Sequence, residues 1–455
     1  MLDHRPQFSA AESPLHGLGT RPKISILVSD LSSRGAGRWG GAVRPFLLGQ
    51  ALQGMGYPVE IVGFSAESDA ETGTRSESAP ASGMSQAISR ANRVLPGACD
   101  IPVHTIFLTT PSPGLGAVGR LFRHLNGDII YAYKPKPSSF GLALLHRQFS
   151  RSQHRRPVLI DIDDWELSWH GGDAYRYHPQ PRQLARDLLK SEGALRNPDH
   201  PLYLQWIERL VAKADLVTTH NDFLRRRFGG VIIPNGKDVE LFNPDRYDAA
   251  ASRAAYGLSD YRVLMFPGAP RPYKGVEDIL AAMDRLNEPD LKLVIVGGSP
   301  YDDYDRTLID RWPQHIIHLG KQPYADMPRV IAAAHVVVVP QRQTPAAQAQ
   351  FPLKLTDGMA MAKPILATRV GDIPTILNGC GYLVDADAPT QLAAQITAIF
   401  ANYDQALELG KRARDRTLTH YSMAAMGAGL HQAIQQSIVA KMHRQSHIPE
   451  CPSPP

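Results

Sequence analysis

Residues 261–298 read YRVLMFPGAPRPYKGVEDILAAMDRLNEPDLKLVIVGG. The segment starts with an apolar run typical of a buried strand, passes through a loop rich in Gly and Pro, and continues as an amphipathic helical pattern. A second apolar run then completes a strand, helix, strand unit. Because such a unit places its two strands side by side in the same direction, the segment predicts part of a parallel sheet with helices on its faces.

The same alternation of strands and helices runs through two consecutive halves of the chain. Candidate strands of the first half are residues 23–31, 58–64, 104–110, 128–133, 157–163, 214–220 and 230–236, and those of the second half are residues 261–268, 291–298, 314–320, 335–341 and 363–371. We therefore predict an α/β fold of two doubly wound, Rossmann-like domains, residues 22–237 and 238–415, that face a central cleft. Ligands of such sheets bind beyond the carboxyl ends of the strands, so a ligand is expected in the cleft.

Four further segments complete the expected organisation. Residues 1–21 and 443–455 are expected to be disordered tails, and residues 66–90, rich in Ser, Ala, Gly and Glu, a mobile excursion. Residues 416–442 are expected to form a C-terminal helix that returns to the first domain. Its apolar positions recur at the spacing of a packed helix: Met423, Met426, Leu430, Ile434 and Ile438.

The composition is that of a globular protein, with an apolar content of 43% and a charged content of 20%. At 455 residues the chain exceeds one ordinary core, which favours two domains. The 3 cysteines are widely spaced, which is typical of a reducing compartment and argues against a disulfide framework or a structural zinc site. No apolar run reaches the roughly 20 residues that span a bilayer, and the N-terminus lacks the apolar core of a secretory signal. We predict a cytoplasmic protein.

Two loops that follow strands carry residues suited to binding an anion. The first ends in Gly40 and Gly41 before a helix, where glycine allows close approach of the backbone and the helix N-terminus favours negative charge. A plain turn between strand and helix is the alternative. The second loop carries Arg271 and Lys274, which can bind a diphosphate through a guanidinium fork and a point charge. Solvated surface cations are the alternative there.

A third candidate lies in the segment FPLKLTDGMAMAKPIL, residues 351–366, which predicts a short helix followed by a strand. Lys354 and Asp357 are three residues apart and share one face of this otherwise apolar helix. A simple salt bridge between them is one interpretation. However, the helix must start at the rim of the cleft, where Lys354 would contact phosphate oxygens and Asp357 would accept hydrogen bonds from sugar hydroxyls. We interpret the pair as part of a ligand site.

Clustered carboxylates end the predicted strand at residues 157–163. Asp161, Asp163 and Asp164 are close enough in sequence to repel one another, which can keep one of them protonated or basic. A metal site, a catalytic base and a structural cap are all compatible with this pattern. Glu166 and nearby His170 are available as further metal ligands.

These residues, in this order, resemble the retaining nucleotide-sugar glycosyltransferases of the GT-B fold, in particular glycosyltransferase family four. The likeness spans about residues 23–440. The segments that carry it include GGAVRPFLLGQALQGMGYPVEIV, ADLVTTHNDFLRRRF, VIIPNGKDVELFNP, FPGAPRPYKGVEDILAAM, LKLVIVGG, IIHLGKQPYADMPRVIAAAHVVVVP and PLKLTDGMAMAKPILATRVGDIPTIL. The ordered set is far more specific than any one segment.

The resemblance implies roles for the residues of the anion-binding loops. Gly40 and Gly41 would border the donor diphosphate and the acceptor, and Lys274 would contact the diphosphate. Arg271 would be the partner of Lys274, although the family places its Arg directly after the loop glycine, where this chain has Ala269.

The largest departure from the family concerns a pair of glutamates separated by seven residues. Asp357 occupies the second position, which in the family contacts the nucleotide ribose, and Ala349 occupies the first. Either Gln350 or Gln348, which flank Ala349, could replace the lost contact with the donor sugar. A neutral amide cannot match the lost charge.

The acid cluster would serve the acceptor. Asp163 falls where many family members carry a His that touches the donor sugar and the acceptor, and we predict Asp163 and Asp164 as the catalytic residues that orient an acceptor hydroxyl or take its proton. The family transfers the sugar with retention and without an obligatory metal, because backbone amides, Lys and Arg stabilise the leaving diphosphate. The resemblance thus implies neither a metal nor another cofactor.

The predicted function is transfer of a sugar, hexosyl in type, from a nucleotide-diphosphate sugar to a saccharide or lipid-linked glycan. One alternative is a GT-B enzyme with another activity, a sugar epimerase or phosphorylase. The other is a catalytically inactive GT-B protein that binds glycans or protein partners, which the missing first glutamate favours. Donor hydrolysis or transfer by the purified protein would separate an enzyme from a binding module.

Two basic patches indicate where the protein works. Residues 146–156 and 223–228 are rich in Arg, and in the second patch Phe223, Leu224 and Phe228 flank the arginines, as in a segment that touches an anionic interface. A solvated basic face is the alternative for each patch. No stacking platform or known nucleic-acid motif accompanies them, so nucleic acid is not a predicted partner. We predict weak, salt-sensitive association with the inner face of a membrane.

Overall fold

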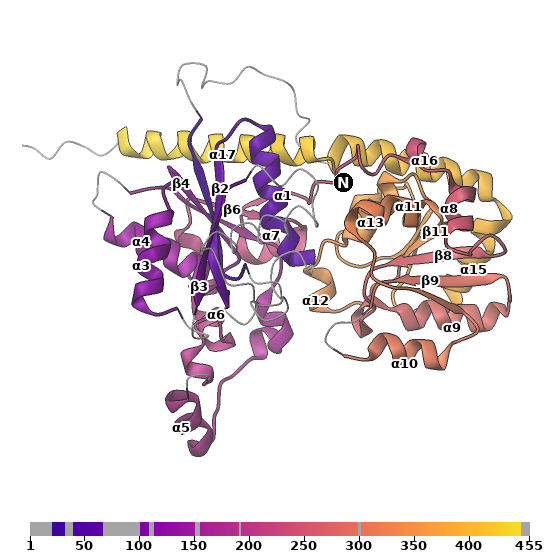
Figure 1. Cartoon of the computed structure of the whole chain (residues 1–455), viewed down its shortest axis with the longest axis horizontal. Coiled ribbons are helices and arrows are strands. Elements are labelled where there is room, and N and C mark those ends of the chain that lie inside the picture. The colour runs from indigo at the N-terminus through magenta and orange to yellow at the C-terminus, as the bar shows by residue number, and fades with distance from the viewer. Residues whose placement is uncertain are drawn as a thin grey trace, which may run out of the picture.

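The computed structural model contains two α/β domains, and its long last helix lies along the N-terminal domain (Figure 1). The residues it describes are 21–31, 40–66, 101–108, 113–150, 155–190, 193–298 and 302–446. The predicted excursion, apart from Ala66, and most of the two predicted tails lie outside these ranges.

The N-terminal domain is built on a parallel sheet whose described strands follow the order β3-β2-β1-β4-β5-β6-β7. These strands are β1 (Ile24–Val28), β2 (Val59–Ala66), β3 (Val103–Leu108), β4 (Ile129–Tyr133), β5 (Val158–Ile162), β6 (Leu216–Thr219) and β7 (Val231–Ile232). The helices of this domain are α1 (Gly40–Gly54), α3 (Leu115–His124), α4 (Leu142–Phe149), α5 (Pro181–Leu189), α6 (Pro201–Glu208) and α7 (Asp222–Phe228). The central strands are wholly buried, as their continuous apolar sequences predict.

The C-terminal domain contains a second parallel sheet with the described order β10-β9-β8-β11-β12-β13. Its strands are β8 (Arg262–Pro267), β9 (Leu291–Val296), β10 (Ile316–Leu319), β11 (Val336–Val339), β12 (Ile365–Thr368) and β13 (Tyr382–Val384). Its helices are α8 (Ala249–Ala255), α9 (Val276–Leu286), α10 (Tyr304–Arg311), α11 (Met327–Ala332), α12 (Pro345–Gln348), α13 (Leu353–Ala360), α14 (Ile373–Leu377), α15 (Pro389–Ala401) and α16 (Tyr403–His420).

Each sheet has one point at which its strand order reverses. In the first sheet β1 pairs with both β2 and β4, and in the second β8 pairs with both β9 and β11. A crevice opens outside the carboxyl ends of the strands at such a point. The two reversal points therefore determine where each domain can hold a ligand.

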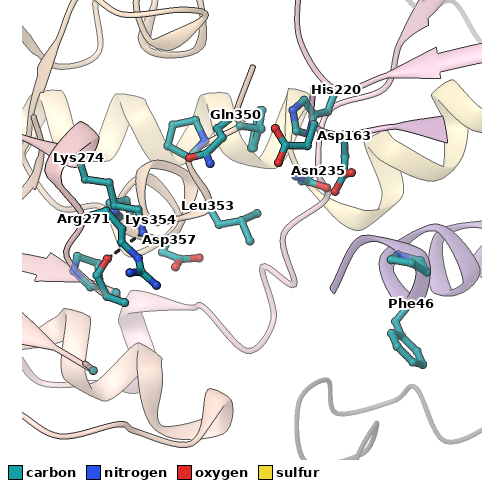
Figure 2. A pocket seen from close by; sticks show the side chains of 18 of the residues that line it. Phe46, Asp163, His220, Asn235, Arg271, Lys274, Gln350, Leu353, Lys354 and Asp357 are labelled. Carbon is teal, nitrogen blue, oxygen red and sulfur yellow. Dashed lines mark hydrogen bonds between the residues drawn. The ribbon is translucent and has the colours of Figure 1, made fainter. Parts of the chain in front are cut away.

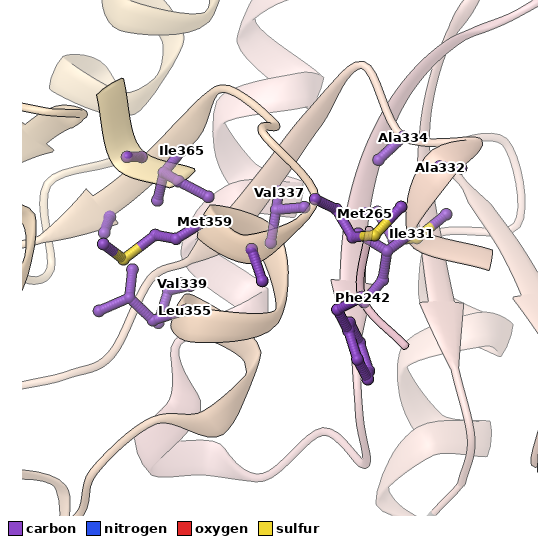
Figure 3. Packing of buried hydrophobic residues seen from close by; sticks show 14 of the residues in the cluster. Phe242, Met265, Ile331, Ala332, Ala334, Val337, Val339, Leu355, Met359 and Ile365 are labelled. Carbon is purple, nitrogen blue, oxygen red and sulfur yellow. The ribbon is translucent and has the colours of Figure 1, made fainter. Parts of the chain in front are cut away.

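Helix α13 is fixed against the second sheet by close packing (Figure 3). Leu355 and Met359 are buried in the same apolar cluster as Val337 of β11 and Ile365 of β12. A Cβ atom on Gly358 would lie 2.7 Å from Cδ1 of Ile365 and 3.0 Å from Cβ of Val337, so a larger residue would require the helix or the strands to shift. The tight packing holds the N-terminal turn of α13 at the edge of the sheet where ligands bind.

The last helix, α17 (Met423–Ser446), packs against α1 of the N-terminal domain. Met426, Leu430 and Ile434 are buried in the core cluster of that domain, whereas the side chain of Ile438 lies outside the described residues. The returning helix starts later than the predicted residue 416, because α16 continues to His420 and packs against α13. Residues 416–420 therefore belong to the C-terminal domain.

Candidate active site

The two reversal points open into one cleft of about 1160 Å³ (Figure 2). Its walls are formed by residues that directly follow β1, β4 and β5 on one side and β8, β9 and β11 on the other, together with the start of α13. Both domains thus contribute to a single site, as expected for two doubly wound sheets that face each other.

Two lysines contribute positive charge to the C-terminal wall beside the sheet and α13. Lys274 follows β8, and Lys354 lies in the first turn of α13. Nζ of Lys274 donates a hydrogen bond to the carbonyl of Ala269 at 2.8 Å, and Nζ of Lys354 lies 3.8 Å from the centre of the Phe266 ring. Within the described chain, neither lysine has a carboxylate as an ion-pair partner.

The electrostatics of these lysines favour an anionic ligand. Burial and, to a smaller extent, the charge of Arg271 together lower the pKa of Lys274 to about 8. Burial also holds the pKa of Lys354 well below its ordinary value; the charge of Lys274 acts in the same direction and that of Asp357 opposes it. A buried ammonium group without a carboxylate partner is costly, and a bound anion would remove that cost.

Arg271 and a glycine complete this wall. Arg271 lines the cleft, but its Nη1 is 2.7 Å from Oδ2 of Asp302, so part of its guanidinium is already occupied. Gly268, at the end of β8, has a φ of 142°, which side chains rarely adopt, and a Cβ atom there would lie 3.8 Å from Cε of Lys354. The glycine leaves the backbone open to a ligand beside the lysine.

Lys354 and Asp357 both line the cleft, but they bind different groups. The carboxylate of Asp357 forms an ion pair with Nζ of Lys237, in the segment that joins the two domains. Burial opposes the charge of Lys237, but Asp357 and the hydroxyl of Tyr324 raise its pKa above the ordinary value. The salt bridge considered as an alternative therefore involves Lys237 rather than Lys354, and Asp357 helps to fasten the interdomain segment to α13.

Ala349 stands where the resemblance implies a glutamate, and it makes its polar contact through the backbone. Ala349 is fully buried, and its carbonyl accepts a hydrogen bond from Nε2 of His220 at 2.9 Å. Next to it, Gln350 lines the cleft, and its Nε2 donates to the hydroxyl of Tyr273 at 3.2 Å. Of the two glutamines that flank Ala349, Gln350 rather than Gln348 is among the residues that line the cleft.

His220 was not predicted as a site residue. It follows β6, is buried, and lines the cleft beside Asn235. Burial and the charge of Arg44 lower its pKa to about 3, so the imidazole is neutral. Because a carbonyl oxygen only accepts, Nε2 carries the hydrogen, and Nδ1 is an acceptor without a hydrogen-bond partner among the described residues. The one sequence signal that could have identified His220 is its place at the end of a predicted strand.

The three aspartates at the end of β5 have different environments. Asp161 is fully buried and accepts hydrogen bonds from Nε and Nη2 of Arg44 at 2.6 and 2.8 Å. Nη1 of the same arginine donates to Oδ1 of Asn235 at 2.9 Å. Asp161 is thus a structural residue that ties α1 to the sheet and, through Arg44, positions Asn235 in the wall of the cleft.

Asp163 lines the cleft on the side opposite Lys354 (Figure 2). Its Oδ2 accepts a hydrogen bond from the hydroxyl of Tyr133 at 2.6 Å. Its Oδ1 lies 3.7 Å from Nζ of Lys134 and, within the described chain, accepts no hydrogen bond. This oxygen is buried, and no described residue donates a hydrogen bond to it.

Asp164 is next to an aromatic contact between the domains. Burial raises its pKa to about 7, with Glu166 and Asp163 adding to the shift and Lys134 opposing it. Its Oδ2 accepts a hydrogen bond from Nε1 of Trp169 at 2.9 Å. The rings of Trp169 and Tyr273 meet edge to face with their centres 5.6 Å apart. Neither aromatic residue was predicted, although both line the cleft.

Glu166, one of the further candidate metal ligands near the acid cluster, is engaged in ion pairs. Glu166 forms ion pairs with Lys134 at 2.5 Å and with Lys136 at 3.3 Å. No set of three or more His, Cys, Asp or Glu side chains in the described chain is arranged to hold a metal ion.

The structure bears only indirectly on Gly40 and Gly41. Gly40 is the first residue of α1, and the loop before it, residues 32–39, lies outside the described ranges. The contact of these glycines with a donor diphosphate stays a prediction.

The arginines of the basic patch at 223–228 are paired with acidic residues, and contact of this patch with a membrane stays a prediction. Leu224 is buried, and Arg225 and Arg226 pair with Asp222 of their own helix. Arg227 pairs with Glu208 and Asp173, and its guanidinium lies 3.9 Å from the centre of the Trp165 ring. In the other patch, residues 151–154 lie outside the described ranges.

Residues 261–402 match the family model described as "Glycosyl transferases group 1". The C-terminal domain is a glycosyltransferase group 1 domain. This group 1 domain holds every C-terminal residue predicted to bind the donor: Arg271, Lys274, Gln350, Lys354 and Asp357.

Curated relatives extend the match beyond the group 1 domain. The chain is 27% identical over 303 residues to a GDP-mannose-dependent alpha-(1-6)-phosphatidylinositol monomannoside mannosyltransferase of Mycolicibacterium smegmatis, which covers 61% of this chain and 78% of the relative. It is 29% identical over 198 residues to a D-inositol 3-phosphate glycosyltransferase of Segniliparus rotundus, which covers 40% of this chain and 41% of the relative. The predicted identification as a glycosyltransferase is confirmed.

The solved structure of Anabaena Alr3699/HepE in complex with UDP has the same fold. It superposes with a TM-score of 0.64 at 16% sequence identity and covers 91% of this chain and 100% of that chain. This likeness confirms the predicted GT-B architecture. Within the described chain, no helix is both long enough and apolar enough to span a membrane.

Proposed function

We propose that the protein transfers a sugar of hexose type from a nucleotide-diphosphate sugar to a saccharide or lipid-linked glycan, with retention and without a metal. The observation that carries the proposal is the pair of lysines, Lys274 and Lys354, whose pKa values are lowered in a cleft of a group 1 domain. A diphosphate placed between them would give both lysines an anionic partner, which the described protein chain does not provide.

The donor would lie along the C-terminal wall. Lys274, Lys354 and the N-terminal turn of α13 would stabilise the charge that develops on the leaving diphosphate, because they are already in place before the reaction. Arg271 would contribute less, since Asp302 occupies part of its guanidinium. Asp357 would accept a hydrogen bond from a ribose hydroxyl while it keeps its ion pair with Lys237.

The acceptor would lie along the N-terminal wall. The carboxylate of Asp163, which lines the cleft, would orient the attacking hydroxyl through a hydrogen bond. Asp164, with a pKa of about 7, could take up the proton near neutral pH. Gln350 would replace the family glutamate as the contact to the donor sugar. Retention follows from the family resemblance.

The names of the relatives suggest the acceptor class. The Mycolicibacterium relative is named for a phosphatidylinositol monomannoside and the Segniliparus relative for an inositol phosphate. We infer that a polyol or a glycolipid is the acceptor and that the protein works in the cytoplasm, at the inner face of a membrane.

Proton NMR of the purified protein with a panel of UDP- and GDP-sugars tests the proposal. Slow hydrolysis of one donor, or its transfer to an added inositol or mannoside acceptor, is expected, with the anomeric configuration of the donor retained in the first product. Addition of EDTA should leave the rate unchanged.

A glycan-binding protein without activity is the second candidate, since Ala349 replaces a charged family residue. It predicts nucleotide binding without turnover of any donor in the same panel.

A further inference from the structure

Helix α5 lies at the far end of a projection from the N-terminal domain (Figure 1). All of its residues are exposed except Asp187, so the polar residue faces the protein and the apolar residues face outward. Leu184, Leu188 and Leu189 have exposed fractions of 38%, 51% and 77%. This arrangement is the reverse of that in a helix that packs on a core.

The sequence of α5, PRQLARDLL followed by Lys190, separates apolar from basic residues. At about 100° per residue, the three leucines fall within an arc of roughly 140°. The side chains of Arg182, Arg186 and Lys190 fall on the adjacent arc. An apolar stripe bordered by basic residues is typical of a helix that lies in the surface of a membrane.

Polar contacts at the inner side of α5 set its orientation. Asp187 accepts a hydrogen bond from the hydroxyl of Tyr177 at 2.8 Å, and Arg196 donates from Nε to the carbonyl of Leu188 at 3.0 Å. A Cβ atom on Gly193 would lie 2.2 Å from the carbonyl oxygen of Asp187, so the chain returns very close to the helix. The leucine side chains are therefore held outward by contacts in which those side chains take no part.

We propose that α5 is the element that docks this protein on an anionic lipid surface. The leucines would enter the boundary between headgroups and acyl chains, and Arg182, Arg186 and Lys190 would contact anionic headgroups. Residues 176–196 contain five basic and two acidic residues, a net charge of +3, which complements such a surface. The inference refines the proposed function, on which its link to a lipid-linked acceptor rests.

A second copy of the chain fits the leucine face less well. A stable protein interface buries about 800 Å² on each partner. One face of a helix of nine residues, which is only about 14 Å long, is too small to provide that area. Docking on lipid needs no such area. The stretch of chain that lines the cleft at Trp169 continues to α5, so a docked α5 would bring the acceptor side of the cleft toward the bilayer.

Cosedimentation of the full chain with lipid vesicles at low salt tests the proposal. The wild-type protein should bind vesicles of phosphatidylcholine with phosphatidylglycerol and should bind pure phosphatidylcholine vesicles at least fivefold less. The double variant Leu188→Ser/Leu189→Ser should lose at least fivefold of the binding to anionic vesicles. Leu418→Ser, at a leucine of α16 with an exposed fraction of 41%, is the matched control and should bind like the wild type.

Two further measurements make each outcome decisive. Arg182→Gln/Lys190→Gln keeps the leucines and should weaken binding to anionic vesicles only. Equal binding by the wild type and Leu188→Ser/Leu189→Ser would overturn the proposal, as would a wild-type dimer in sedimentation equilibrium that this variant converts to a monomer. Calorimetric binding of UDP and GDP without lipid reports on the donor site alone, so loss of vesicle binding with intact nucleotide binding separates this inference from the proposed function.

Discussion

Nucleotide binding should weaken above pH 8 because Lys274 has a lowered pKa of about 8 in the free protein. A bound diphosphate favours the charged ammonium and raises that pKa. The contribution of Lys274 is therefore complete below pH 8 and is lost as the pH rises through that value. At pH 9 about one tenth of the free protein carries the charge, so affinity should be about tenfold, or about 1.4 kcal/mol, lower than at pH 7.

The variant Lys274→Arg isolates this effect, since a guanidinium stays charged throughout the range. Titration calorimetry with UDP and GDP measures the ratio of the affinity at pH 7 to the affinity at pH 9. This ratio should be about ten times larger for the wild type than for the variant. Repeating the pH 9 titration in buffers of different ionisation enthalpy should reveal proton uptake by the wild type. Equal falls in the two proteins would refute the assignment of Lys274 to the diphosphate.

Four further results are expected. Lys354→Met should raise the melting temperature of the ligand-free protein, because it removes a buried cation without a carboxylate partner; a lower melting temperature in scanning fluorimetry would contradict this. Asp163→Asn and Asp164→Asn should each lower kcat by about 10²–10⁴ with little change in donor KM, whereas nearly intact transfer would make the acid cluster structural. Gly358→Leu should cost about 1–3 kcal/mol in urea unfolding, since its Cβ position is crowded by Ile365. Activity should survive exhaustive chelation, and its loss would disprove a metal-free reaction.

The fold could be predicted from local patterns because each strand and helix carries its own signal. Apolar runs such as those of β8 and β9, with a helical pattern between them, define a parallel unit without knowledge of distant contacts. Lys274 and Lys354 could be identified for the same reason: one lies in the loop after a strand, and the other lies in the first turn of a helix at the sheet edge.

The partners of the site residues could not be predicted, because they depend on contacts between distant segments. Arg44 and Asp161 are 117 positions apart, and His220 and Ala349 are 129 positions apart. No local pattern links such residues. The pairing of Asp357 with Lys237 and the exposed leucines of α5 were missed for this reason. The ion pairs of the arginines of 223–228 were not predicted, because their acidic partners lie on other segments or one turn away.

The central claim is that Lys354 binds the phosphates of a nucleotide-sugar donor, and titration calorimetry of Lys354→Ala tests it most directly. UDP and GDP are titrated into the wild type, into Lys354→Ala and into the control Lys292→Ala. Lys292 lies at the amino end of β9, and its Nζ donates a hydrogen bond to the carbonyl of Gln314. Loss of a charge-assisted contact should weaken binding by about 1.5–3 kcal/mol in Lys354→Ala, with the control unchanged. Nucleotide affinity equal to that of the wild type in Lys354→Ala would contradict the claim.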